Sequence, residues 1–221
     1  LFERLYNELH DAGGKGAYSE SDFELYDYMI WEFFICATAV LLHYERFAEL
    51  RQLLVHPYFL RTDYFNSNIE PQTFDIFRKY TRTIEEVCKP KSENPRLFTL
   101  AGEILVNREK KPILTKQSIA NADIVLYQLN GIFDTSENKR WSMWFPTTYI
   151  YHQGQQVLWK KLISKSYCKK IFPLFSVNTV DELKEKVQGS VESRDIRYNN
   201  SWHNAPGILS SIKLDEIGTL E

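Results

Sequence analysis

The sequence predicts a mainly α protein: a helical single domain with a central buried apolar helix and little β structure. Two observations carry this prediction. Residues 29–42 are almost uniformly apolar, and most of the remaining chain places apolar side chains at the spacing of amphipathic helices. With 221 residues the chain can bury one large core, and its 14% aromatic content is typical of a globular protein.

The apolar run belongs to a helix that we expect to begin near Ser21, because Glu24 follows three residues later as in a capping box. Between Met29 and Leu42 only Glu32 is charged, so we expect this helix to be buried on all sides. A membrane span needs about 20 apolar residues. The apolar run at residues 29–42 is shorter and is followed by charged residues, so we predict that the helix does not span a membrane.

The other elements follow from the same spacing rules. Glycines at 13–16 end a first helix, and Pro57 ends a second, because the residue before a proline is pushed out of helical geometry. We expect helices at residues 1–9, 47–54, 71–88, 115–132, 155–172 and 181–188, a short helix or strand at 97–106, and extended structure at 141–152.

We predict one domain over residues 1–221, and residues 89–96 are the place where a subdomain break is expected, because they combine prolines with charges. The chain begins at Leu1 within a helical pattern, so we expect it to be excised from a longer protein or part of one. Cys36, Cys88 and Cys168 are scattered, which favours reduced thiols and a cytoplasmic location. No Cys or His pair has metal-ligand spacing, so we predict no metal and no cofactor.

The clearest asymmetry in the sequence is one of charge. The net charge of the chain is -2, yet residues 139–180 contain no Asp or Glu and carry seven positive charges. Lys161, Lys165 and Lys169 are spaced four residues apart, which places them on one face of the helix expected at 155–172.

Aromatic residues are interleaved with these lysines. Cations for phosphates and flat rings for bases are what single-stranded nucleic acid requires. The alternative is a solvated basic face beside aromatic core residues, or a surface for an acidic protein partner. The candidate binding residues are Trp141, Trp144, Tyr149, Lys160, Lys161, Lys165, Lys169 and Lys170.

A second candidate site is an Arg–His pair. Four residues separate Arg51 from His56, and five separate Arg197 from His203. This spacing resembles the Arg–His motif of the HEPN ribonucleases, which are helical. The resemblance implies metal-independent RNA cleavage, in which the histidine moves the 2′-hydroxyl proton and the arginine stabilises the charged phosphate. Arg51 and His56 are the catalytic candidates, because they lie at a predicted helix end.

From the sequence we therefore predict an intracellular binding or regulatory module. Its basic and aromatic surface at 139–170 is expected to contact nucleic acid, a nucleotide or an acidic protein partner. The alternative is a HEPN-like ribonuclease that uses Arg51 and His56. The high aromatic content also predicts self-association into a homo-oligomer, without locating an interface.

Overall fold

The computed structural model describes residues 1–11, 22–60, 71–95, 98–133, 144–148, 156–192 and 205–221. The α-helices are α1 (Phe2–Asp11), α2 (Glu24–His43), α3 (Phe47–Val55), α4 (Leu100–Asn107), α5 (Lys116–Phe133), α6 (Val157–Lys160), α7 (Lys165–Phe175) and α8 (Val180–Glu192). Shorter helical turns are η2 (Phe74–Phe77), η3 (Thr83–Cys88), η4 (Lys89–Lys91), η6 (Lys161–Ile163), η7 (Ile208–Ser210) and η8 (Leu214–Glu216). The strands of the described residues are β1 (Tyr58–Phe59) and β2 (Pro71–Gln72), an antiparallel pair with Tyr58 opposite Gln72.

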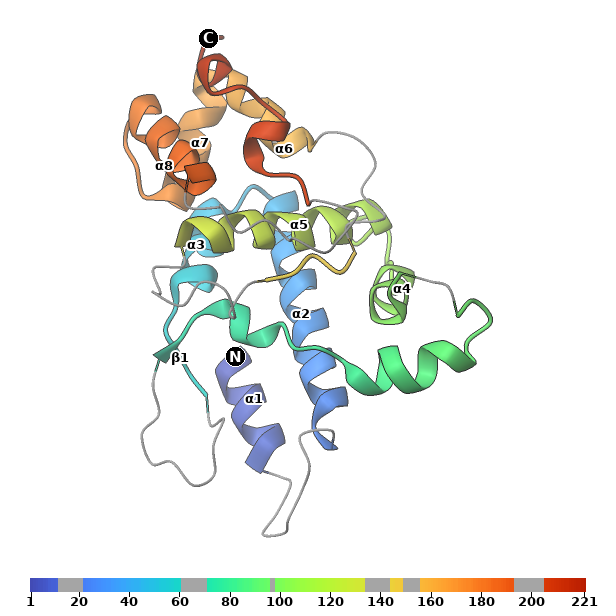
Figure 1. The fold of residues 1–221 in the computed structure, drawn as a ribbon. Helices are drawn as coiled ribbons and strands as arrows, with labels where there is room; N and C mark the ends of the chain where they lie inside the picture. Colours follow the sequence, from blue (N-terminus) through green and yellow to red (C-terminus); the bar gives the residue numbers. More distant parts are fainter. Residues whose placement is uncertain (12–21, 61–70, 96–97, 134–143, 149–155, 193–204) are drawn as a thin grey trace.

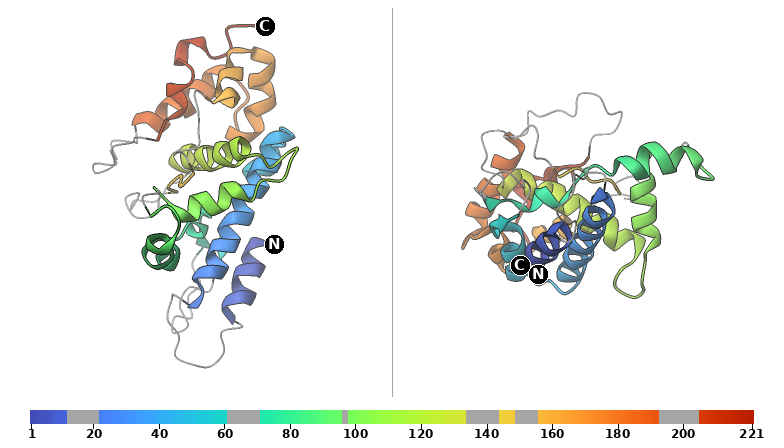
Figure 2. Two further views of the ribbon diagram at one scale, coloured as in Figure 1. Left: turned by 90° about the vertical axis from the view of Figure 1, so that its right-hand side faces the viewer. Right: turned by 90° about the horizontal axis from the view of Figure 1, so that it is seen from below.

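Helix α2 is the central element, and α5 crosses it (Figure 1). Helices α7 and α8 lie on one side of α5, and α1 and α4 lie on the other side (Figures 1 and 2). The mainly α class predicted from the sequence is therefore confirmed. The extent of the domain and its boundaries stay predictions.

Phe34 of α2 is the centre of the aromatic core. The ring centroids of Phe2, Phe77, Trp144 and Phe74 lie 5.0, 5.3, 5.8 and 5.9 Å from that of Phe34. Because these rings come from segments far apart in the sequence, a single α2 side chain joins α1, η2 and the segment at 144–148 in one packed cluster.

Several predicted helices are confirmed, and two predictions need correction. The helices expected at 1–9, 47–54, 115–132 and 181–188 are α1, α3, α5 and α8, and the 97–106 segment forms α4. The single helix expected at 71–88 is wrong. Arg78 leaves helical geometry at φ -92° and ψ 91°, and its guanidinium donates to the carbonyl of Phe145 at 3.2 Å.

The single helix expected at 155–172 is also wrong, because it breaks at Ser164. Ser164 has extended geometry, and its hydroxyl caps α7 by accepting from the Tyr167 amide. Its neighbour Lys165 donates its amide to the carbonyl of Leu220 at 2.7 Å. The C-terminal segment therefore enters at the break and separates α6 and η6 from α7.

Helix α2 begins at Glu24 without a side-chain cap. Ser21, the expected capping residue, lies outside the described residues. Glu24 is the first residue of α2 and not the third, as a capping box requires, and its carboxylate accepts from the amide of Thr83 at 2.7 Å. This acidic side chain therefore fixes α2 to the start of η3.

Three buried polar side chains of α5 hold the segments around it. The carboxylate of Asp123 is fully buried and accepts from Trp144 Nε1 at 2.7 Å, from the Thr148 amide at 2.8 Å and from the Thr148 hydroxyl at 2.8 Å. Asn130 Oδ1 accepts from the Trp144 amide at 3.0 Å. Gln128 accepts from Trp159 Nε1 at 2.7 Å and donates to the carbonyl of Pro206 at 2.6 Å.

We predict that Asp123→Asn lowers the free energy of unfolding by about 2–4 kcal/mol, because the amide has one acceptor oxygen and its NH2 group must face either Trp144 Nε1 or the two donors of Thr148. Urea denaturation followed by circular dichroism measures the change. Asp215→Asn is the matched control, since Asp215 is exposed, and it should change the stability by less than about 0.5 kcal/mol. Equal effects of the two substitutions would contradict the importance of the buried carboxylate.

Candidate functional site

The predicted lysines lie at the surface of α6, η6 and α7. We call Lys160, Lys161, Lys165, Lys169 and Lys170 the lysine surface, and all five side chains are exposed. The prediction that Lys161 shares a helix face with Lys165 and Lys169 is wrong, because the break at Ser164 puts Lys161 in η6 and the other two in α7.

The aromatic part of this predicted surface is not present at the described positions. Trp144 is fully buried, and its ring nitrogen donates to Asp123, so it belongs to the core and cannot stack on a base from solvent. Trp159 is also fully buried. Trp141 and Tyr149 lie outside the described residues. The two described tryptophans of the predicted surface therefore belong to the core, and the exposed part that remains of it is cationic.

Part of the positive charge is balanced within the chain. Glu45, in the turn between α2 and α3, accepts from Lys161 and from Lys170, each at 3.1 Å. These two hydrogen bonds hold the pKa of Glu45 below its ordinary value. Lys165 pairs with Glu221 at 2.5 Å. The carboxylate of Glu45 therefore joins η6, α7 and the α2–α3 turn. The lysine surface is less basic than the seven positive charges at residues 139–180 suggest.

The ion pairs of Glu45 predict a pH dependence of stability. Because the folded-state pKa is lowered, the contribution of this carboxylate is present above the pKa of the unfolded chain and is lost as pH falls through the folded-state pKa, below about pH 4. Glu45→Gln should flatten this acid loss and leave stability above pH 6 lower than in the wild type. Thermal melts between pH 3 and 7 test this, and parallel pH profiles of the two proteins would contradict it.

Arg51 and His56 have different partners in the structure. Arg51 Nη1 donates to the carbonyl of Leu174 in α7 at 3.1 Å, and its guanidinium lies 5.4 Å from the ring centroid of Phe133. His56 Nε2 lies 3.9 Å from Glu3 Oε2 in α1. The two residues therefore contact different neighbours, and the ribonuclease site stays a prediction. Arg197 and His203 lie outside the described residues.

The largest unexpected feature is the solvent-facing side of α2, where the prediction of burial on all sides is wrong. Leu25, Met29 and Phe33 are 63%, 37% and 48% exposed, whereas Ile30, Trp31, Phe34 and Ile35 on the opposite side are buried. We call the solvent-facing apolar side chains the α2 outer face: Leu25, Tyr26, Met29, Phe33, Cys36, Ala37 and Val40. Figure 2, seen from below, places α1 and α2 at one edge of the molecule.

The α2 outer face has the spacing of a helix-pairing seam. Tyr26, Met29, Phe33, Cys36 and Val40 follow one another at intervals of three, four, three and four residues. This is the alternation of the apolar positions in a coiled-coil heptad. The signal is present in the sequence, but the inner face of α2 is equally apolar and conceals it.

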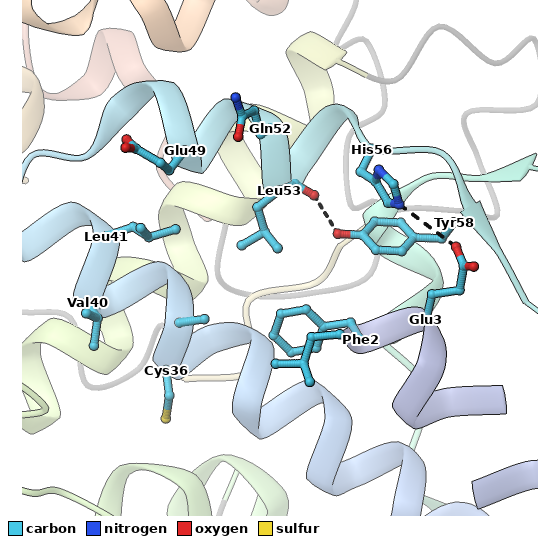
Figure 3. Close-up of a pocket in the computed structure, with 12 residues that line it drawn as sticks. Phe2, Glu3, Cys36, Val40, Leu41, Glu49, Gln52, Leu53, His56 and Tyr58 are labelled. Carbon is cyan, nitrogen blue, oxygen red and sulfur yellow. Dashed lines mark hydrogen bonds and ion pairs between the residues drawn. The ribbon is translucent and has the colours of Figure 1, made fainter. Parts of the chain in front are cut away.

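A groove adjoins the C-terminal half of the α2 outer face (Figure 3). Its volume is about 660 Å³. Its floor is formed by α2, and the N-terminus of α1 and one side of α3 border it, with Phe2, Ala37, Leu41 and Leu53 among its lining residues. The apolar surface of α2 therefore continues into a hollow between helices, which is the usual shape of a binding groove.

The α2 outer face carries no net charge. Glu32 lies at its edge and pairs with Arg108 Nε at 3.5 Å, as expected for a partly buried carboxylate. Burial raises the pKa of Cys36 to about 11, so its thiol stays neutral at pH 7. An apolar partner could cover this face without stranding an unpaired charge.

Helix α2 is also the one helix of the described residues that is long and apolar enough to cross a membrane. In its most apolar window, 44% of the residues are buried inside the protein, which is compatible with a core helix and with the prediction of no membrane span. Among the described residues, no group of three or more His, Cys, Asp or Glu side chains is placed to hold a metal ion.

Comparisons of the chain with protein-family models, with curated proteins and with solved structures find no match. The features of the chain that bear on its function are therefore the α2 outer face, the groove beside it and the lysine surface.

Proposed function

We propose that the chain is a protein-interaction module that binds an amphipathic helix along the α2 outer face. The observation that carries this proposal is a row of apolar side chains at heptad spacing on a 20-residue helix, of which Tyr26, Met29 and Phe33 are exposed and Cys36 and Val40 are half-buried. A contiguous apolar surface of this kind is uncommon on an isolated protein and marks an interaction site.

The groove supports a helix as the binding partner. An amphipathic helix places its apolar side chains at intervals of three and four residues, which matches the spacing along α2. Side chains of such a helix can enter the hollow next to Ala37 and Leu41 while its backbone stays fully hydrogen-bonded. Burying the exposed half of Phe33 alone contributes about 1 kcal/mol to association.

We predict that Phe33→Asp weakens the binding of an apolar helix at least about tenfold, since a carboxylate would be buried in the contact. The probe is a fluorescently labelled three-heptad peptide with leucine at both apolar heptad positions and lysine and glutamate elsewhere. Fluorescence anisotropy during a titration with the protein measures the affinity.

Phe98→Asp is the matched control, because Phe98 is 43% exposed and lies outside the α2 outer face. Both variants should keep the melting temperature of the wild type, since neither side chain is part of the core. Absence of saturable binding by the wild type, or an equal loss in both variants, would contradict the proposed function.

The lysine surface supports a second candidate function, the binding of an acidic protein surface. Lys160 and Lys169 are exposed, and the structure gives neither of them an ion pair among the described residues. An acidic protein is a better candidate than nucleic acid, because the described tryptophans of this region are buried.

We predict that the double variant Lys160→Glu and Lys169→Glu loses binding to poly-L-glutamate, whereas Lys110→Glu with Lys116→Glu retains it. Biolayer interferometry at low and high salt measures this binding, which should weaken as salt increases. Binding that does not depend on salt, or that both double variants lose equally, would remove the lysine surface from consideration.

A further inference from the structure

The two halves of the α2 outer face differ in shape. The N-terminal half protrudes, because Leu25, Met29 and Phe33 are large side chains that are 63%, 37% and 48% exposed. The C-terminal half has smaller side chains, Cys36, Ala37 and Val40, and all three line the groove. One helix therefore carries a ridge at one end and a hollow at the other.

A ridge and a hollow on the same surface make that surface complementary to a second copy of itself. A two-fold axis between Phe33 and Cys36 would place a second α2 antiparallel to the first. In this register Phe33 lies opposite Cys36 of the second copy, Met29 lies opposite Val40, and Tyr26 lies opposite His43. Each contact joins a large side chain from the ridge to a smaller one or to the end of the helix.

We propose that the partner of the α2 outer face is a second copy of this chain, bound in this antiparallel, two-fold arrangement. The inference rests on the proposed function and names its partner. A parallel arrangement would instead place Met29 on Met29 and Phe33 on Phe33, and would leave the two hollows facing each other unfilled. Tight packing requires the antiparallel choice.

The charges near α2 allow this pairing. The face has no charged side chain of its own, and the two carboxylates that line the adjoining groove have partners within the same chain: Glu49 pairs with Arg46, and Glu3 lies 3.9 Å from His56. Glu32 at its edge is already paired with Arg108 within the same chain. The neutral thiol of Cys36 lies next to the proposed axis, where the two helices come closest.

The area of the face places the dimer among the small specific interfaces. A helix of 20 residues is about 30 Å long. With the adjoining groove, the contact strip is roughly 20 Å wide, so each copy buries about 600 Å² and the pair about 1,200 Å², the lower end of specific interfaces. The expected dimer is therefore reversible, with a dissociation constant on the order of 10 μM.

Sedimentation equilibrium of the full chain tests the dimer directly. The chain has a mass of 26.1 kDa, and its average mass should rise toward twice that value with concentration. Phe33→Asp should weaken self-association at least about tenfold, and Phe98→Asp should leave it unchanged. Unchanged association of Phe33→Asp would place the dimer contact elsewhere and overturn the inference.

Disulfide trapping tests the register. One preparation carries Met29→Cys and the other carries Val40→Cys, each with Cys36→Ser and Cys88→Ser. Mixed and oxidised, they should cross-link, whereas Met29→Cys alone should not, because its two copies would be separated by about 16 Å along the antiparallel helices. Efficient cross-linking of Met29→Cys to itself would show a parallel pair and overturn the antiparallel arrangement.

The two proposals fail in different ways. The wild type could stay monomeric at 100 μM, on the order of ten times the expected dissociation constant, and still bind the leucine heptad peptide. That result would overturn the proposal that the partner is a second copy and would keep the helix-binding function. A wild type that stays monomeric and binds no peptide overturns both. Transfer of the protein to neutral phosphatidylcholine vesicles with protection of Phe33 would mean that lipid covers the face, and would also overturn the inference.

Discussion

The buried carboxylate of Asp123 is the interaction on which the arrangement of this fold depends. A carboxylate without solvent is destabilising unless its oxygens are hydrogen-bonded, and here Trp144 and Thr148 supply all three donors. Burial raises the pKa of Asp123, and these hydrogen bonds act in the opposite direction. These hydrogen bonds to the carboxylate hold the segment at 144–148 against α5. The segment has no regular secondary structure of its own.

That position then constrains the neighbouring elements. Trp144 packs beside Phe34, which links the segment to α2. On its other side the segment comes so close to α4 that a Cβ atom at Gly102 would lie 2.9 Å from the carbonyl oxygen of Thr147. Arg78 donates to the carbonyl of Phe145, which explains why the chain leaves helical geometry there. Three elements that are distant in sequence are thus positioned by one short segment.

The sequence predicts what depends on local spacing and does not predict what depends on distant partners. Helices α1, α3 and α5 follow from apolar periodicity, whereas the break at Ser164 depends on Leu220, a residue 56 positions away. Lys161 and Lys170 form a basic cluster in the sequence, but they share a carboxylate contributed by the α2–α3 turn. Trp144 looks like a surface aromatic among lysines until the acceptor of its ring nitrogen is known.

The α2 outer face is a second feature that the sequence does not predict. An apolar residue such as Phe33 is predicted to be buried wherever its neighbours are also apolar. Composition alone does not distinguish the buried side of a helix from an exposed apolar side. The heptad intervals were present in the sequence, but only the burial of Ile30, Phe34 and Ile35 on the other side separates the two faces.

The hydrogen-bond partners of α5 also have a consequence for biosynthesis. Helix α5 is complete once residue 133 has been made, but the donors for Asp123 and Asn130 come from residues 144–148, and the partners of Gln128 are Trp159 and Pro206. Until the ribosome has released those segments, the polar side chains of α5 have only water as a partner, so the cost of removing that water opposes the packing of α5 on α2. The centre of this protein is therefore assembled late, after most of the chain has been translated.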